Sequence, residues 1–185
     1  MARREVVRKK VFGVDLEEIG EGVENLFVFE FMNYVILNPK QGIFREAGDC
    51  KEMLLLKKRL DSGERIIPSS TYIHNLTNLI KVYLRELPTP LIPQSSYDSL
   101  CSLLSDSEDR EDLPKKFGEF FLAEYGTERL YFLKEIIGAM ARLIEHADVT
   151  KMNISNLSLV FSPNLVRLDG KATLNSLVNS RANEI

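Results

Sequence analysis

The sequence predicts an all-α protein that forms a single compact domain of several helices. Apolar residues recur every three to four positions through most of the chain, which is the period of an amphipathic helix. No stretch alternates between apolar and polar residues as a β-hairpin would. The chain has 185 residues, 44% hydrophobic and 28% charged, which is typical of one globular domain with a full core. We expect this domain at 12–185, after a flexible basic leader at 1–11.

A buried helix is expected near the start of the domain, at about 21–37, with 11–19 leading into it. Its sequence LFVFEFMNYVIL is apolar on almost every side but also contains Glu30 and Asn33. The run is much shorter than the roughly 20 residues that cross a bilayer, so we interpret it as a core helix. Pro39 ends it, because the residue before a proline is disfavoured in the helical conformation.

The stretch GIFREAG (42–48) connects this helix to the next one, which has a clear start. Asp49 is a good N-cap residue, and Glu52 three positions later completes a pattern that resembles a capping box. The helix should run to about Asp61 and stop at Gly63, because glycine readily adopts the left-handed conformation that ends helices. GIFREAG is therefore expected to be a tight connection between two helices.

The most regular helix is expected at 69–87, with the sequence SSTYIHNLTNLIKVYLREL. Serine and threonine residues at its start are candidate caps, and Pro88 and Pro90 prevent it from continuing. One side of this helix carries the apolar residues that would face the core: Ile73, Leu76, Ile80, Leu84 and Leu87.

A second side of the same helix carries a polar stripe of His74, Asn78, Lys81 and Arg85, at steps of four, three and four residues. The solvated face of an amphipathic helix has the same pattern, so the stripe alone does not indicate a site. Arg85 lies near the helix end, where its guanidinium could reach a neighbouring loop and bind its carbonyl groups. Periodicity alone leaves both interpretations open.

The rest of the chain is expected to form further helices and a tail. These helices are expected at 94–105, 113–124, 128–146 and 153–161. The core-facing residues of 128–146 should be Leu130, Leu133, Ile137, Met140 and Ile144. Pro163 should end the last of these helices, and the polar tail after Arg167 has room for one short closing helix.

The composition argues against several classes of function. The net charge of −3 disfavours nucleic acid as a partner. Cys50, Cys101, His74 and His146 show no metal-ligand spacing, so we expect no metal site and two reduced thiols. The phosphate-binding motif GxxxxGK[ST], the zinc motif HExxH and the nucleophile motif GxSxG are all absent. We therefore expect no cofactor and no nucleotide site in this chain.

The composition also predicts a cytoplasmic protein. The first residues, MARREVVRKK, are basic, but no apolar segment of a signal peptide follows them. No apolar run reaches the length of a transmembrane helix. We interpret the leader as a flexible tail or the end of a linker, in preference to a segment that binds membranes or nucleic acid.

Four motifs follow one another over 12–168: VFGVDL, GIFREAG, IKVYLRELPTPLIP and TKMNISNLSLVFSPNL. In this order they resemble FGVPL, GIFR-x-x-G, L-K-x-F-L-R-E-L-P-x-P-L and N-K-M-x-x-x-N-L-A-x-x-F-G-P-N-L of the RhoGAP domain, which activates Rho-family GTPases. Each motif alone is moderately specific, and the ordered set makes the resemblance strong. The sequence departs from the family pattern at Asp15, Glu46, Thr150 and Ser162.

This resemblance implies a nearly all-helical, monomeric domain that accelerates GTP hydrolysis by a GTP-bound GTPase of the Rho, Rac or Cdc42 type. Arg45 matches the family's catalytic arginine finger. Lys81 and Arg85 match a basic pair, in which the arginine steadies the finger loop and the lysine helps with the GTPase surface. Asn164 matches an asparagine that contacts the bound GTPase.

The resemblance also implies an enzyme activator with no cofactor of its own, because Mg²⁺ and GTP belong to the partner. Signal transduction, cytoskeleton regulation and recruitment to membrane-bound GTPases would follow from such a role. An alternative is a non-catalytic RhoGAP-fold module that binds a GTPase or another signalling partner, although Arg45 is present. Glu46 could pair with a nearby cation and tune the loop, and Ser162 could shift Asn164.

Overall fold

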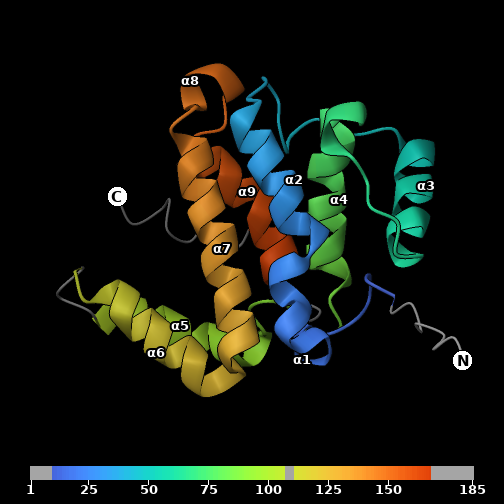
Figure 1. Cartoon of the computed structure of the whole chain (residues 1–185). Coiled ribbons are helices and arrows are strands. Elements are labelled where there is room, and N and C mark those ends of the chain that lie inside the picture. The colour runs from blue at the N-terminus through green and yellow to red at the C-terminus, as the bar shows by residue number, and fades with distance from the viewer. Residues whose placement is uncertain (1–9, 107–110, 168–185) are drawn as a thin grey trace, which may run out of the picture.

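The computed structural model describes residues 10–106 and 111–167, and its regular elements in these ranges are all helical. An isolated parallel bridge joins Ile92 and Val166. The predicted all-α class is therefore confirmed, and Figure 1 shows how the helices are arranged. In chain order they are α1 (Leu16–Ile19), the 3-10 helix η1 (Gly20–Asn25), α2 (Phe27–Leu37), α3 (Cys50–Asp61), the 3-10 helix η2 (Pro68–Ser70), α4 (Ile73–Glu86), α5 (Gln94–Asp106), α6 (Leu113–Tyr125), α7 (Thr127–Ile144), α8 (Ala147–Thr150) and α9 (Ile154–Leu165).

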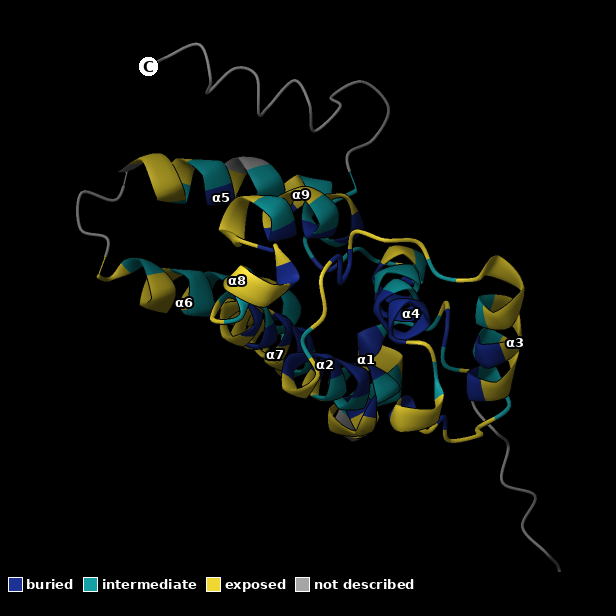
Figure 2. Ribbon diagram, turned by 90° about the horizontal axis from the view of Figure 1, so that it is seen from above, coloured by how far each residue is buried: buried dark blue, intermediate teal, exposed yellow. Residues whose placement is uncertain are grey.

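The core lies between α2, α4, α7 and α9, which pack side by side (Figure 1). Helix α3 packs against the outer side of α4, and α5 and α6 form a pair at the other end of the molecule. Figure 2 shows α4 as the most buried helix, while α3 exposes its outer face. Each large apolar side chain buried here contributes roughly 1.5–3 kcal/mol to stability. The largest of those that are fully buried are Phe12, Phe31, Phe44, Tyr83, Phe132 and Phe161.

Two helices begin later than the sequence predicted. The first buried helix starts at Phe27 instead of 21, because Gly20 and Gly22 disfavour α-helix and the residues before it form η1. Helix α4 starts at Ile73 instead of 69. The hydroxyl groups of Ser70 and Thr71 do not cap α4, since they donate to the Ile67 carbonyl of the preceding turn at 3.0 and 3.1 Å.

The last core helix runs through Pro163 to Leu165, so the prediction that it would stop near 161 is wrong. A proline near a helix end removes one hydrogen bond but keeps a φ angle that suits a helix. Side chains on either side of the proline add hydrogen bonds to backbone carbonyl groups. The Ser162 hydroxyl and the Asn164 amide donate to the carbonyls of Ser158 and Val160, both at 2.7 Å.

The buried face of α7 also differs from the predicted one. Leu133 is buried as expected, but Ile137 is 53% exposed. Apolar residues occur on more than one side of this helix, so their spacing alone did not single out the side that packs against α2. The buried residues are Arg129, Phe132, Leu133, Ile136, Ala139 and Leu143.

Both predicted end segments lie largely outside the described residues. The closing helix after Arg167 cannot be compared, and of the leader at 1–11 only Lys10 and Val11 are described. The backbone amides of Val11 and Phe12 both donate to Asp61 Oδ1 at 2.9 Å, so the folded part begins by Val11. Within 10–106 and 111–167, no helix has both the length and the apolar character needed to cross a membrane.

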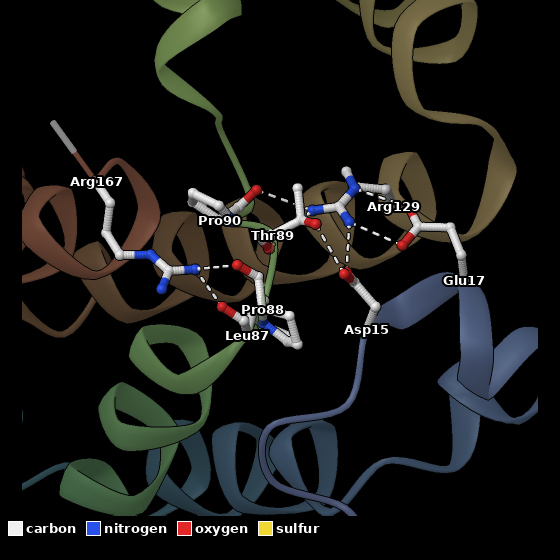
Figure 3. A network of polar contacts seen from close by, with 8 residues as sticks. All are labelled: Asp15, Glu17, Leu87, Pro88, Thr89, Pro90, Arg129 and Arg167. Atoms are coloured by element: carbon white, nitrogen blue, oxygen red, sulfur yellow. Dashed lines mark hydrogen bonds and ion pairs between the residues drawn. The ribbon is translucent and has the colours of Figure 1, made fainter. Parts of the chain in front are cut away.

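A buried arginine of α7 links the start of the domain to the connection after α4 (Figure 3). Arg129, which is 1% exposed, donates to Asp15 Oδ1 at 2.9 Å and to both carboxylate oxygens of Glu17 at 2.8 and 2.9 Å. It also donates to the carbonyls of Thr89 and Pro90, at 3.2 and 2.9 Å, in the connection after α4. Burial raises the pKa of Asp15, but hydrogen bonds from Thr89 and Arg129 and the charge of Arg129 lower it overall.

Arg129→Met is expected to lower the free energy of unfolding by roughly 1–3 kcal/mol, because it removes a charged donor from the carbonyls of Thr89 and Pro90 and from two carboxylates. The pKa of Asp15 is lowered on folding, so its stabilising effect is complete above its ordinary value of 3.8 and is lost as the pH falls below that value. The difference between variant and wild type should therefore shrink in acid. Chemical denaturation at several pH values measures both effects.

The control is Arg65→Met, which removes an ion pair with Glu30 from an arginine whose side chain is 80% exposed. Its unfolding should stay close to that of wild type, because exposed ion pairs contribute little. Equal destabilisation by the two substitutions would show that the buried Arg129 network has no special role.

Candidate functional site

The GIFREAG segment forms a compact turn between α2 and α3. The amides of Arg45 and Glu46 both donate to the carbonyl of Gly42, at 3.0 and 2.8 Å. The Gly42 amide in turn donates to the carbonyl of Thr150 at the end of α8, at 3.1 Å. Gly42 has a φ of 79°, and a Cβ atom there would lie 2.1 Å from Glu46 Oε1. Only glycine therefore fits this turn with the Glu46 side chain where it is.

Two apolar side chains anchor the turn in the core. Ile43 and Phe44 are fully buried, and the Phe44 ring packs against Phe161 of α9 with their centroids 4.8 Å apart. Phe44 also has a φ of 64°, a left-handed conformation that costs a non-glycine residue roughly 1–3 kcal/mol. Burial of its ring offsets this strain. The next residue, Arg45, is held at the surface as a consequence.

The guanidinium of Arg45 is exposed and makes no hydrogen bond or ion pair with any residue that the structure describes. The adjacent carboxylate of Glu46 does not neutralise it. That side chain folds back over Gly42 and places Oε2 3.6 Å from Nε2 of His74, a buried histidine of α4. The cation that could pair with Glu46 is therefore His74, when its imidazole is protonated. Arg45 keeps its guanidinium free of the Glu46 carboxylate.

The polar stripe of α4 faces this turn. Lys81 Nζ donates to the carbonyl of Phe44 at 2.6 Å, and Asn78 Nδ2 donates to the carbonyl of Glu46 at 2.9 Å. Burial, and after it the charge of Arg85, lower the pKa of Lys81 below its ordinary value. The stripe is therefore a support for the turn that carries Arg45, rather than only a solvated face.

Lys81 makes the contact that the sequence assigned to Arg85. Arg85 is exposed, and its guanidinium has no hydrogen-bond partner within the described ranges. The lysine is one turn closer to the Phe44 carbonyl, and its half-buried side chain reaches it directly. In this structure Lys81 holds the turn, while Arg85 is free to meet another molecule.

Asn164 is on α9, three residues after Phe161, whose ring packs against Phe44. It is 6% exposed, and its Nδ2 donates to the carbonyl of Val160 in its own helix at 2.7 Å. The amide is therefore engaged within the domain. Its contact with a bound partner remains a prediction.

Asn75 of α4 is a supporting residue that the sequence analysis missed. It is fully buried, its Oδ1 accepts from the Asp49 amide, and its Nδ2 donates to Glu52 Oε2, both at 2.7 Å. The Asp49 carboxylate accepts from the Glu52 amide at 2.8 Å, which confirms the predicted N-cap. Asn75 therefore stands between the Asp49 amide and the Glu52 carboxylate, which would bond directly in a capping box. It also lies close to Gly48, where a Cβ atom would be 2.3 Å from the Asn75 Oδ1.

Chemically, the turn presents the free guanidinium of Arg45, and the neighbouring helix α4 presents that of Arg85. Such a group can donate several charge-assisted hydrogen bonds to an anion. Among the residues described, no group of three or more histidine, cysteine, aspartate or glutamate side chains could hold a metal ion. The free guanidinium can therefore stabilise negative charge on another molecule.

Comparison with known proteins decides the family. The model of the family described as "RhoGAP domain" matches residues 26–170, most of the chain. The chain belongs to the RhoGAP family. The turn at 42–48, α4 and α9 all lie within the matched region, so the predicted family is confirmed, although the motif VFGVDL at 11–16 precedes this region.

Related RhoGAP proteins are much longer than this chain. Rho GTPase-activating protein 22 of Mus musculus is 34% identical over 134 residues, which cover 69% of this chain and 18% of that protein. Rho GTPase-activating protein 24 of Homo sapiens is 33% identical over 134 residues, which cover 69% of this chain and 17% of that protein. The chain thus spans less than a fifth of these relatives.

Solved RhoGAP structures have the same fold. The crystal structure of human Rho GTPase activating protein 15 superposes with a TM-score of 0.80 at 20% identity, covering 97% of this chain and 88% of that one. The BH domain of GRAF, the GTPase regulator associated with focal adhesion kinase, gives a TM-score of 0.69 at 21% identity, covering 90% and 87%. Members of the RhoGAP family are activators of GTPases rather than enzymes themselves.

Proposed function

We propose that this RhoGAP domain accelerates GTP hydrolysis by a small GTPase of the Rho, Rac or Cdc42 type, with Arg45 inserted in trans as an arginine finger. The observation that carries the proposal is an exposed guanidinium, unpaired among the described residues, on a turn whose two preceding residues, Ile43 and Phe44, are fully buried. Family membership supplies the class of partner.

The chemistry of phosphoryl transfer explains what a free arginine would add. Negative charge spreads over the phosphate oxygens in the transition state, and a GTPase supplies Mg²⁺, a P-loop lysine and a glutamine that orients the attacking water. An arginine inserted in trans stabilises the remaining charge and raises turnover by roughly 10³–10⁵. Guanidinium suits this task because it stays charged when water is removed and presents planar, forked donors.

The structure of the turn favours such a role, because little of it needs to be ordered on binding. Ile43 and Phe44 are buried, and Lys81 fixes the carbonyl that precedes Arg45. A preorganised group loses less conformational entropy when it docks, so more of its interaction energy is available to the transition state. Arg85, exposed beside Lys81, and Asn164 would then add contacts with the GTPase.

The direct test is GTP turnover by a panel of Rho-type and Ras-type GTPases, each with and without the domain. We expect acceleration of at least one Rho-type member and none of the Ras-type members. Absence of acceleration across the Rho-type panel, with complexes still forming on GTP-loaded protein, would instead favour a non-catalytic binding module.

Lys81→Met is expected to slow single-turnover hydrolysis at saturating domain by about tenfold, because the Phe44 carbonyl loses a charge-assisted hydrogen bond and the turn loosens. The Kd for the GTP-analogue form should change little. Arg85→Ala should instead weaken binding, and its effect should shrink at high salt, where a charge contact with the partner is screened.

Lys58→Met is the matched control, because Lys58 is an exposed lysine on α3. It should leave both the rate and the Kd unchanged. Equal effects of Lys81→Met and Arg85→Ala on rate and Kd, with the same salt dependence, would contradict the division of roles described above.

A further inference from the structure

The turn that carries Arg45 has two arms that are held in different ways. The upstream arm contains Ile43 and Phe44, which are fully buried. The downstream arm has no buried apolar side chain: Glu46, Ala47 and Asp49 are exposed and Gly48 is half-buried. Hydrophobic burial therefore cannot fix the backbone that follows Arg45, and polar contacts must do so.

Asn78 provides the polar contact nearest to Arg45 on this downstream side. Its Nδ2 donates both to the carbonyl of Glu46, at 2.9 Å, and to the carbonyl of His74 in its own helix, at 2.7 Å. The second bond fixes the rotamer of the asparagine against α4. The bond to the Glu46 carbonyl then holds the peptide group one residue beyond Arg45 at a fixed position relative to α4.

Together with Lys81, Asn78 brackets the arginine from one helix. Lys81 holds the carbonyl of Phe44 and Asn78 that of Glu46, so side chains one turn apart fix the peptide group that precedes Arg45 and the one that follows Glu46. The amide between them, that of Glu46, is bonded to Gly42. Each peptide group that sets the direction of the Arg45 side chain is therefore held.

We propose that Asn78 is a positioning residue for Arg45, and that Asn75 supports it by holding the Asp49 amide at the end of the same arm. This inference rests on the proposed function of Arg45. The chemistry requires an amide donor, since the two acceptors that Asn78 meets are both carbonyl oxygens. Aspartate has nearly the same shape but, when ionised, has only acceptors and would repel both.

The test compares Asn78→Asp and Asn78→Ala in the 185-residue chain with a responsive Rho-type GTPase. Single-turnover hydrolysis at saturating domain should fall by about fivefold in Asn78→Ala and by more in Asn78→Asp. The Kd for the GTP-analogue form should stay within about twofold, because Asn78 acts through Arg45 and not through the partner. Combined with Arg45→Ala, neither substitution should lower the rate further.

The matched control is Asn33→Ala on α2. Asn33 is exposed, and its amide oxygen accepts from Arg142 at 3.3 Å, away from the turn. With this variant, the GTPase should hydrolyse GTP at the same rate as with the wild-type domain. Thermal unfolding of each variant verifies that it is folded, and Asn78→Ala provides the comparison should Asn78→Asp not fold.

Amide hydrogen exchange of the free domain separates this inference from the proposed function. Residues 45–48 should exchange faster in both Asn78 variants than in wild type, whether or not any GTPase responds. Unchanged exchange there, or an equal loss of rate on the Arg45→Ala background, would overturn the positioning role of Asn78. Failure of wild type to accelerate any GTPase would overturn the role of Arg45 instead, and the exchange result would still decide what holds the turn.

Discussion

Replacing Arg45 by alanine is expected to reduce domain-stimulated GTP hydrolysis by roughly 10³-fold or more, with little change in the Kd for the GTP-analogue form of the GTPase. The loss corresponds to at least about 4 kcal/mol of transition-state stabilisation. The reason is that Arg45 is the free cation of a turn whose other groups are already engaged within the domain. Stopped-flow or single-turnover measurements at saturating domain give the rate.

Two further observations separate a catalytic arginine from a structural one. Arg45→Lys should recover little of the rate, because an ammonium group cannot reproduce the planar fork of guanidinium. The unfolding of Arg45→Ala should match that of wild type, since the side chain is exposed and unpaired among the described residues. Retention of near wild-type acceleration by Arg45→Ala would show that the catalytic assignment is wrong.

Local signals in the sequence predicted much of the fold. The N-cap at Asp49 and the connection at 42–48 were found because capping and turn chemistry act within a few residues. The start of α4 was predicted too early, because the Thr71 hydroxyl donates to the Ile67 carbonyl of the preceding turn instead of capping the helix. Helix α9 continues through Pro163 because a proline in the last turn keeps a helical φ and removes only one hydrogen bond, which the expectation that proline ends a helix did not take into account.

The site was predicted only in part, because its supports come from tertiary packing. Periodicity placed Asn78, Lys81 and Arg85 on one stripe, but it could not say which long side chain reaches the turn. That choice depends on the distance between α4 and the turn. Asn75 was missed because it lies off the stripe, although a polar residue beside an apolar helix face is a signal that a buried partner exists.

Glu46, one of the departures from the family pattern, leaves the guanidinium of Arg45 unpaired among the described residues. A carboxylate next to Arg45 could have paired with its guanidinium and neutralised it. The missing side chain of Gly42 leaves room for the Glu46 carboxylate to fold back, and His74 lies beside it. The charge of Arg45 is thereby kept for a partner.

The wild-type domain is expected to bind a GDP-loaded GTPase carrying a planar metal-fluoride group at least about 100-fold more tightly than the plain GDP form. The planar group mimics the transferring phosphoryl, and a catalyst is complementary to the transition state rather than to substrate or product. Titrations of the domain against the GDP, GDP-plus-fluoride and non-hydrolysable GTP-analogue states measure this preference.

Arg45→Ala should lose most of the preference for the fluoride complex, because the guanidinium is the group that meets the developing charge. It should keep weaker binding to the GTP-analogue form through contacts such as those expected of Arg85 and Asn164. A module that only docks on the GTPase would show the same order of affinities with and without the guanidinium. Indifference of the wild-type domain to fluoride would therefore leave the binding-module interpretation, whereas a preference that disappears with Arg45 can arise only if this side chain enters the site where the phosphoryl group is transferred.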